Sequence, residues 1–167
     1  MGIKFPDKLL MLPRWKHGDF SVRFAASRYH VFCMYHMKYF GQSDHPLAQK
    51  FVDLYTQDLK TKPLWSYVNA SAGDGTRAVV RTNSERMARK ALIHAMGALG
   101  YDSYGRRLDG KGRELRGTIR LFIAEPKTLL NSDFDRVVGY FKAMLQSQVI
   151  PRIVGTFKPG QGSQGRR

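Results

Sequence analysis

The sequence predicts an α+β domain, a two-layer sandwich in which about four helices pack on a small sheet of about three strands, in the order α-α-β-β-α-β-α. Apolar residues recur at three- and four-residue steps in several segments, which is the pattern of helices with one buried face. Short runs rich in β-branched and aromatic residues, such as TIRLFI at 118–123, are typical of strands. The chain has 167 residues, 43% of them hydrophobic, which is enough for one core.

The first half of the chain is predicted to hold two helices joined as a hairpin. After an irregular segment at 1–22, a helix is expected at 25–40, followed by a glycine at position 41. A second helix begins at Ser43-Asp44 and ends before Pro63. The predicted inner face of the first helix is Ala25, Tyr29, Phe32, Cys33, His36, Met37 and Phe40; that of the second is Leu47, Phe51, Leu54, Tyr55 and Leu59.

A β-hairpin is predicted next, with strands at 64–70 and 76–82 around a Gly73-Asp74-Gly75 turn. Thr82 and Glu85 stand three residues apart, as in a capping box, and predict a helix at 83–99 that Gly100 ends. The apolar stripe of this helix is Ala88, Ala91, Leu92, Ala95, Met96 and Leu99.

A polar, glycine-rich loop is expected at 101–117, followed by a strand at 118–124 that Pro126 ends. The last helix is predicted at 133–149, capped by Ser132 or Asn131 and stopped by Pro151. Its inner residues are Phe134, Val137, Val138, Phe141, Leu145 and Val149. One α+β domain therefore spans 23–151, and a basic, mobile tail occupies 152–167.

Charge is the largest anomaly of the composition. There are 28 Lys and Arg residues against 13 Asp and Glu, a formal net charge of +15. Such an excess predicts an anionic partner, with nucleic acid first and acidic lipid second. The sequence contains no stretch of about 18 apolar residues, so it predicts no membrane-spanning helix. The single cysteine, Cys33, excludes an internal disulfide.

The segment GRRLDGKGRELRGTIR at 105–120 predicts an RNA contact, because glycines let the backbone approach a phosphate and arginines match its oxygens. The alternative is a solvated, flexible loop. The tail is a second RNA-binding segment, or else a disordered end that aids solubility. The predicted RNA-binding residues are Arg106, Arg107, Lys111, Arg113, Arg116, Arg120, Arg152, Lys158, Arg166 and Arg167.

Three aromatic residues beside basic segments, Tyr101, Tyr104 and Trp15, are candidates for stacking on unpaired bases, with ordinary packing as the alternative. The sequence contains no RNP-type strand motif and no GXXG clamp in a KH-like setting. It therefore predicts contacts to phosphates and no reading of base sequence.

The sequence carries no signature of catalysis or of a cofactor. It has no P-loop, no nucleophile elbow and no paired-carboxylate pattern, so we expect no enzyme and no catalytic residue. His30 and His36 stand six residues apart, with Cys33 between them. This spacing lacks a complete ligand set, and a packed core group is expected there in place of a metal site.

A small compact domain with the basic loop GRRLDGKGRELRG and the tail FKPGQGSQGRR resembles proteins of organellar, especially mitochondrial, ribosomes. The resemblance implies a structural role in a ribonucleoprotein particle of the mitochondrial matrix, where the chain would bind ribosomal RNA through phosphates and pack against neighbouring proteins. One alternative is an RNA-processing or ribosome-assembly factor, such as a ribonuclease P-type accessory subunit, in the cytoplasm or nucleus. Another is a basic accessory subunit of an organellar membrane complex.

Overall fold

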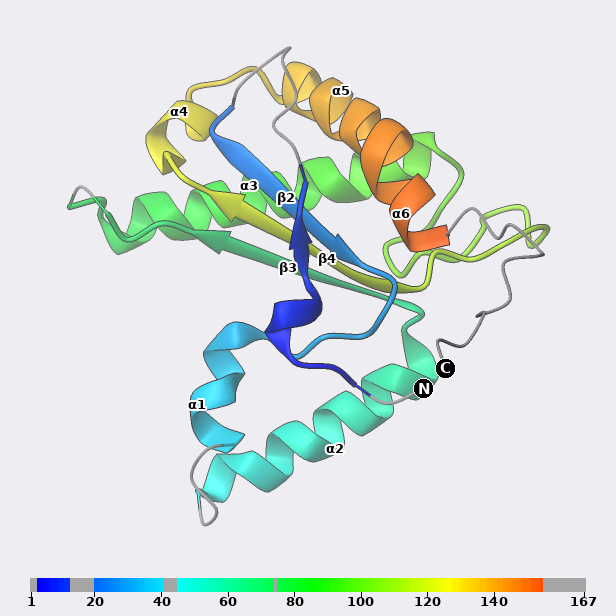
Figure 1. Cartoon of the computed structure of the whole chain (residues 1–167). Helices are drawn as coiled ribbons and strands as arrows, with labels where there is room; N and C mark the ends of the chain where they lie inside the picture. The colour runs from blue at the N-terminus through cyan, green and yellow to red at the C-terminus, as the bar shows by residue number, and fades with distance from the viewer. Residues whose placement is uncertain (1–2, 13–19, 41–44, 74, 155–167) are drawn as a thin grey trace, which may run out of the picture.

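The protein, seen in a computed structural model, is built on a four-stranded open sheet in the order β1-β2-β4-β3 (Figure 1). The structure describes residues 3–12, 20–40, 45–73 and 75–154. β2 is antiparallel to both of its neighbours, β1 and β4, whereas β3 and β4 run parallel. The strands are β1 (Leu10–Met11), β2 (Val22–Ser27), β3 (Leu64–Ala70) and β4 (Gly117–Ile123).

Helices cover one face of this sheet. α3 (Ala78–Ala98) and α5 (Phe134–Met144) pack on each other and on the strands, and α4 (Pro126–Leu130) packs on α3. Alternation along β4 turns Ile119, Leu121 and Ile123 toward these helices, where all three are fully buried. The core continues through the predicted stripe of α3, in which Ala88, Ala91, Leu92, Ala95 and Met96 are buried.

Among the described residues, helices cover the opposite face of the sheet at one end. There α1 (Met37–Phe40) and α2 (Pro46–Thr61) lie beyond β3 (Figure 1). The ring centre of Trp65 on β3 lies 5.2 Å from that of Tyr55 on α2 and 4.7 Å from that of His30. The hydroxyl of Tyr67 donates a hydrogen bond to the carbonyl of Val31 at 3.2 Å.

The α+β class predicted from the sequence is confirmed, whereas the number and order of the strands are not as predicted. The helix at 43–62, the strand at 64–70, the helix at 83–99 and the strand at 118–124 all exist, within a few residues of the expected bounds. The sheet gains β1 and β2, which the prediction lacked. Both strands come from the first 27 residues.

The predicted helix at 25–40 is wrong over most of its length. Its start lies in β2, in which Val22, Phe24 and Ala26 belong to the core, Arg23 is exposed, and Ala25 and Ser27 are also buried. Only a 3₁₀ turn at Met34–His36 and the short α1 are helical. The apolar residues from Ala25 onward fit a helical spacing, but every residue from Val22 to Ser27 pairs with β4. The segment predicted to be irregular, 1–22, also places Leu12 and Phe20 in the core.

The predicted hairpin at 64–82 does not form, because 78–82 belongs to α3. The Thr82–Glu85 capping box is also wrong. Arg77 is the N-cap residue, without a side-chain hydrogen bond, and Thr82 lies inside the helix. The carboxylate of Glu85 accepts a hydrogen bond from the backbone N–H of Ala70 at 2.8 Å, which ties the helix to the end of β3.

Of three end signals in the last third, Pro126 follows the end of β4 as predicted, whereas the other two act differently. Pro126 begins α4, and Asp133, in place of Ser132 or Asn131, caps α5 by accepting from the N–H of Arg136 at 3.0 Å. Pro151 does not stop the helix. A π-helical turn at Leu145–Val149 leads into α6 (Ile150–Val154), since proline lacks the N–H of a regular turn. Arg152 thus lies in α6, and residues 155–167 of the predicted tail lie outside the described residues.

The predicted inner face of α2 is only partly correct. Tyr55 alone is buried, whereas Leu47 and Leu54 are 37% and 42% exposed, because the short α1 does not cover the whole helix. In the described part of the chain, no helix combines the length and apolarity that a bilayer crossing requires.

Candidate nucleic-acid interface

The basic loop, residues 101–116, leaves α3 at Gly100 and has a defined shape. The carboxylate of Asp102 accepts hydrogen bonds from the backbone N–H groups of Tyr104 and Arg106, both at 2.8 Å. At the other end, the side chain of Leu115 is fully buried in the core. The loop is therefore anchored at both ends.

Gly105 fixes the crossing of the two arms of the loop. Its φ is +81°, and a Cβ there would lie 2.6 Å from the carbonyl oxygen of Leu115 and 2.8 Å from the Cβ of Leu64. The N–H of Leu115 donates to the carbonyl of Gly105 at 2.8 Å. No side chain fits at this crossing, so glycine is required.

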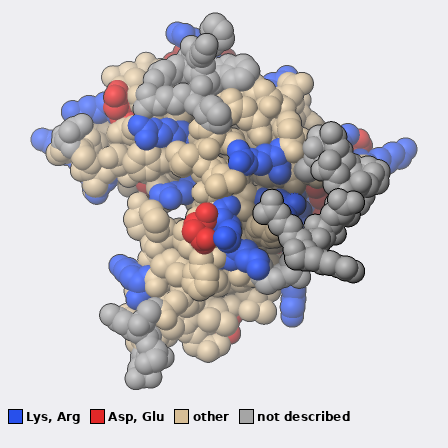
Figure 2. Space-filling model, in the orientation of Figure 1, with Lys and Arg blue, Asp and Glu red and all other residues tan. Residues whose placement is uncertain are grey.

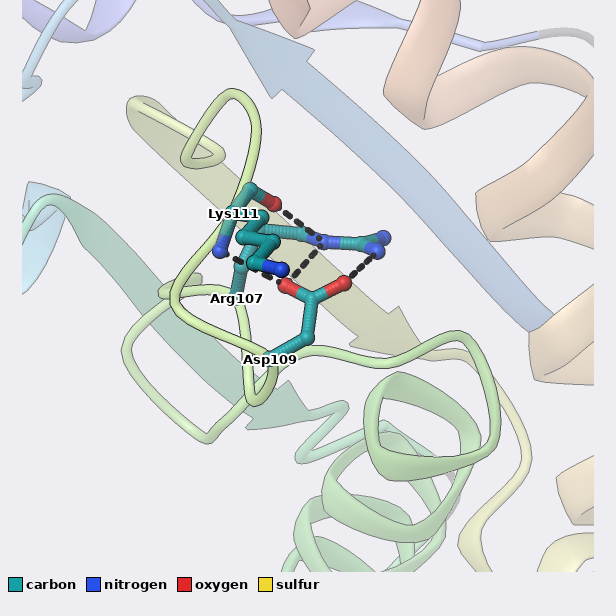
Figure 3. Close-up of polar contacts among 3 residues, drawn as sticks. All are labelled: Arg107, Asp109 and Lys111. Carbon is teal, nitrogen blue, oxygen red and sulfur yellow. Dashed lines mark hydrogen bonds and ion pairs between the residues drawn. The ribbon is translucent and has the colours of Figure 1, made fainter.

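Arg107 closes the middle of the loop (Figure 3). Its Nε lies 3.2 Å from both a carboxylate oxygen of Asp109 and the carbonyl oxygen of Lys111, and its guanidinium lies 5.2 Å from the ring centre of Tyr101. The hydrogen bond from Arg107 lowers the pKa of Asp109, and the same contact raises the pKa of Arg107. Arg107 thus acts as a clamp within the loop.

The cations of the basic loop divide into two groups. Arg106 donates to the carbonyl of Thr61, so Arg106 and Arg107 hold the loop to itself and to the end of α2. Lys111, Arg113 and Arg116 are exposed and have no ion pair with any other described residue. They are the cations of the loop that are available to an anion.

The loop ends beside a second basic surface, the Tyr29 patch, which consists of Lys4, Lys8, Arg28, Tyr29 and Arg152. The backbone of Gly117 packs on Ser27 and Arg28, which brings Arg116 to this surface. Arg28 donates to the hydroxyl of Tyr29 at 2.8 Å and lies 5.0 Å from its ring centre. A hollow is lined by Asp7, Lys8, Leu10, Ala26, Ser27, Arg28, Tyr29 and Arg152.

Charge on this side of the molecule is strongly biased. Lys and Arg side chains spread over the face shown in Figure 2 and clearly exceed the acidic ones. Asp7, the acidic residue of the hollow, is already paired with Lys8 at 3.0 Å. The sequence indicated Arg152 but not the rest of this patch, because the residues come from 4–8, 28–29 and 152. The pairing of β1 with β2 and the packing of α6 on β2 bring them together.

The other residues predicted to contact RNA are dispersed. Tyr101 is half-buried under Arg107, whereas Tyr104 is exposed, with the ammonium of Lys62 5.8 Å from its ring centre. Arg120 lies on β4, on the face of the sheet away from the helices. Trp15, Lys158, Arg166 and Arg167 lie outside the described residues.

His30, Cys33 and His36 are not on one helix as predicted. His30 bonds through Nε2 to the carbonyl of Pro63 at 2.9 Å, and burial, with a smaller effect of the Arg116 charge, lowers its pKa. The hydroxyl of Tyr55 accepts from the N–H of Cys33 and bonds to Nδ1 of His36. Within the described ranges, no three His, Cys, Asp or Glu side chains cluster closely enough to hold a metal ion.

Comparisons of the chain with protein-family models, with curated proteins and with solved structures found no match. Functional inference therefore depends on the geometry and charge described above.

Proposed function

We propose that this protein binds RNA, chiefly through phosphate contacts made by the basic loop and the Tyr29 patch. The observation that carries the proposal is the set of three exposed cations, Lys111, Arg113 and Arg116, which a hydrogen-bonded loop presents without an ion pair to any described residue. Neighbouring cations of this kind repel one another in the free protein, and a row of phosphates relieves that repulsion. A pre-shaped loop also pays little ordering entropy on binding.

As the biological setting, we propose a structural component of a mitochondrial ribosome, located in the matrix, that binds ribosomal RNA. The resemblance of the basic loop and tail to organellar ribosomal proteins supports this setting. Exposed apolar side chains at Met34, Tyr35, Leu47 and Leu54 give neighbouring proteins of a particle a surface to pack on. A role in RNA processing or ribosome assembly uses the same RNA contacts.

The salt dependence of RNA affinity tests the proposal. A plot of log Kd against log salt concentration should have a slope of roughly 3 to 5, because about four to six phosphates are neutralised. A K111Q/R113Q/R116Q variant should flatten that slope by about two to three units. The matched control is R86Q/R89Q/K90Q, which removes the same charge from the exposed side of α3.

Two results would contradict the proposal. Equal loss in the loop variant and the α3 control would mean that net charge alone matters. Salt-independent or absent RNA binding by wild type, together with strong binding to vesicles of acidic lipid, would favour the membrane-complex alternative. Sedimentation of the native protein tests the setting, since a ribosomal component must travel with a ribosomal subunit.

A further inference from the structure

One end of the sheet carries side chains on the face away from α3 and α5 that are neither core nor loop. Figure 1 shows β2 and β4 in front of α3, and β1 is the edge strand that pairs with β2. On this face Arg23 of β2 is directly paired with Phe122 of β4, and Ala25 is paired with Arg120. Paired residues point to the same side of a sheet, so these four side chains form two neighbouring cross-strand pairs on this face.

The strand register makes a hollow between these side chains. Ala25 supplies a small floor, and the larger Met11, Arg23, Arg120 and Phe122 stand around it. Phe122 and Arg120 are only partly buried, Arg23 is exposed, and Met11 is 55% exposed. An aromatic side chain on the surface of a strand between two arginines has no role in the core, because the core residues of β4 all point to the other side.

We propose that this hollow binds single-stranded RNA, with an unpaired base stacked on Phe122 and its flanking phosphates held by Arg23 and Arg120. This inference rests on the proposed RNA-binding function and adds to it a site for unpaired bases. The ring gives a flat apolar surface that any base can cover, and the guanidiniums supply the charge that phosphates need. Met11 adapts its shape to different bases.

Charge complementarity selects RNA over an apolar or basic partner. None of the five lining residues is acidic, and two are cationic. The site also continues from the proposed phosphate contacts. Arg116 precedes β4 and Arg120 lies four residues further, about 13 Å along the strand. Residues 29–31 cover Thr118 between these two arginines, so a short RNA strand that contacts both passes over this segment.

Affinity for two fluorescein-labelled probes tests the site, one a ten-nucleotide oligouridine and the other an RNA duplex of ten base pairs. Phe122→Leu keeps an apolar side chain but removes the stacking surface. We expect oligouridine to bind roughly 5- to 100-fold more weakly to this variant. Duplex affinity should not change, because bases in a duplex are already stacked. Phe122→Tyr should retain wild-type affinity, and the salt slope of Phe122→Leu should equal that of wild type.

Phe134→Leu is the matched control. Phe134 is also half-buried and stands beside Arg86 and Lys90, but on the helical side of the molecule. This variant should bind both probes like wild type. The double variant R23Q/R120Q should flatten the oligouridine slope by about 1.4 units. In wild type, oligouridine should also protect Arg23 and Arg120 from phenylglyoxal, a readout that needs no variant to fold.

The outcomes separate this site from the general function. If Phe122→Leu leaves oligouridine binding unchanged while the K111Q/R113Q/R116Q variant weakens it, the stacking site is refuted and RNA binding stands. If neither probe binds wild type in a salt-dependent way, both proposals fail. If polyglutamate displaces oligouridine equally well from wild type and from Phe122→Leu, the hollow is only a cationic surface, and the stacking proposal is overturned.

Discussion

The two faces of the sheet use the same strands for different purposes. Toward the helices, β4 presents Ile119, Leu121 and Ile123, all fully buried. Toward the other side it presents Arg120 and Phe122, which stay partly exposed, and Arg23 of β2 stands beside them. One face therefore stabilises the fold, and the other is free to carry charge and an aromatic ring. Substitutions on the two faces should affect different measurements.

Truncating one aromatic side chain on each face gives the largest expected contrast. Phe141→Ala removes a fully buried ring that packs edge-to-face on Phe24 at 5.2 Å, and should lower the free energy of unfolding by about 3–5 kcal/mol. Phe122→Ala lies on the face of β2 and β4 that points away from α3 and α5, here named the bare face. It should lower this free energy by less than about 2 kcal/mol, since the ring is already partly in solvent. Urea unfolding of both variants measures the difference. Equal losses would mean that the two faces are not distinct.

The next contrast lies within the basic loop. Gly105→Ala puts a methyl group against the Leu115 carbonyl at a position of positive φ, and we expect at least about 2 kcal/mol of destabilisation. Gly110 also has a positive φ, of +64°, but a Cβ there meets nothing within 4 Å. Gly110→Ala should therefore cost only about 1 kcal/mol, from backbone strain alone. Thermal unfolding distinguishes the two; equal melting temperatures would mean that the crossing at Gly105 is not tight.

The sequence predicted the helical face of the sheet better than the bare one. The stripe of α3 and the strands at 64–70 and 118–124 were recognisable because their periodicity is local. β2 was not, since Ala25 and Ala26 fit a helix as well as a strand, and only pairing with β4 decides between them. The prediction of the helix at 25–40 failed for this reason: tertiary pairing outweighed local pattern. The hairpin at 64–82 failed for a different reason, because its second half is the first turn of α3.

The candidate site was predictable in composition but not in geometry. The net charge and the sequence of the basic loop indicated the cations, including Lys111, Arg113 and Arg116. They did not indicate that Arg106 and Arg107 would be held in internal contacts. The hollow around Ala25 depends on strand register, which brings together residues more than 90 positions apart. The Tyr29 patch depends in addition on the packing of α6 on β2, which brings in Arg152.

A smaller effect should come from pH, at the covered end of the bare face. Burial lowers the pKa of His30 below its ordinary value of 6.5. The unfolded chain therefore takes up a proton before the folded one does, and the stability that depends on neutral His30 is present above about pH 6.5 and lost as pH falls below it. The melting temperature should drop between about pH 7 and 5. His30→Gln, which keeps a donor for the Pro63 carbonyl, should reduce that drop; an unchanged pH profile would contradict the assignment.

The smallest expected effect concerns the Arg107–Asp109 clamp in the middle of the basic loop. Asp109→Asn removes the charge that holds the Arg107 guanidinium, while Lys111, Arg113 and Arg116 remain. Because the contact is exposed to solvent, we expect the melting temperature to change little. The loop itself should open more often, and limited trypsin digestion should then cut faster after Lys111 and Arg113.

Glu114→Gln is the matched control, since Glu114 is an exposed acid of the same loop without a described ion pair. If the clamp pre-shapes the loop for RNA, Asp109→Asn should bind no more tightly than Glu114→Gln, although both variants gain the same net charge. Tighter RNA binding by Asp109→Asn than by Glu114→Gln would show that the loop needs charge and not a fixed shape.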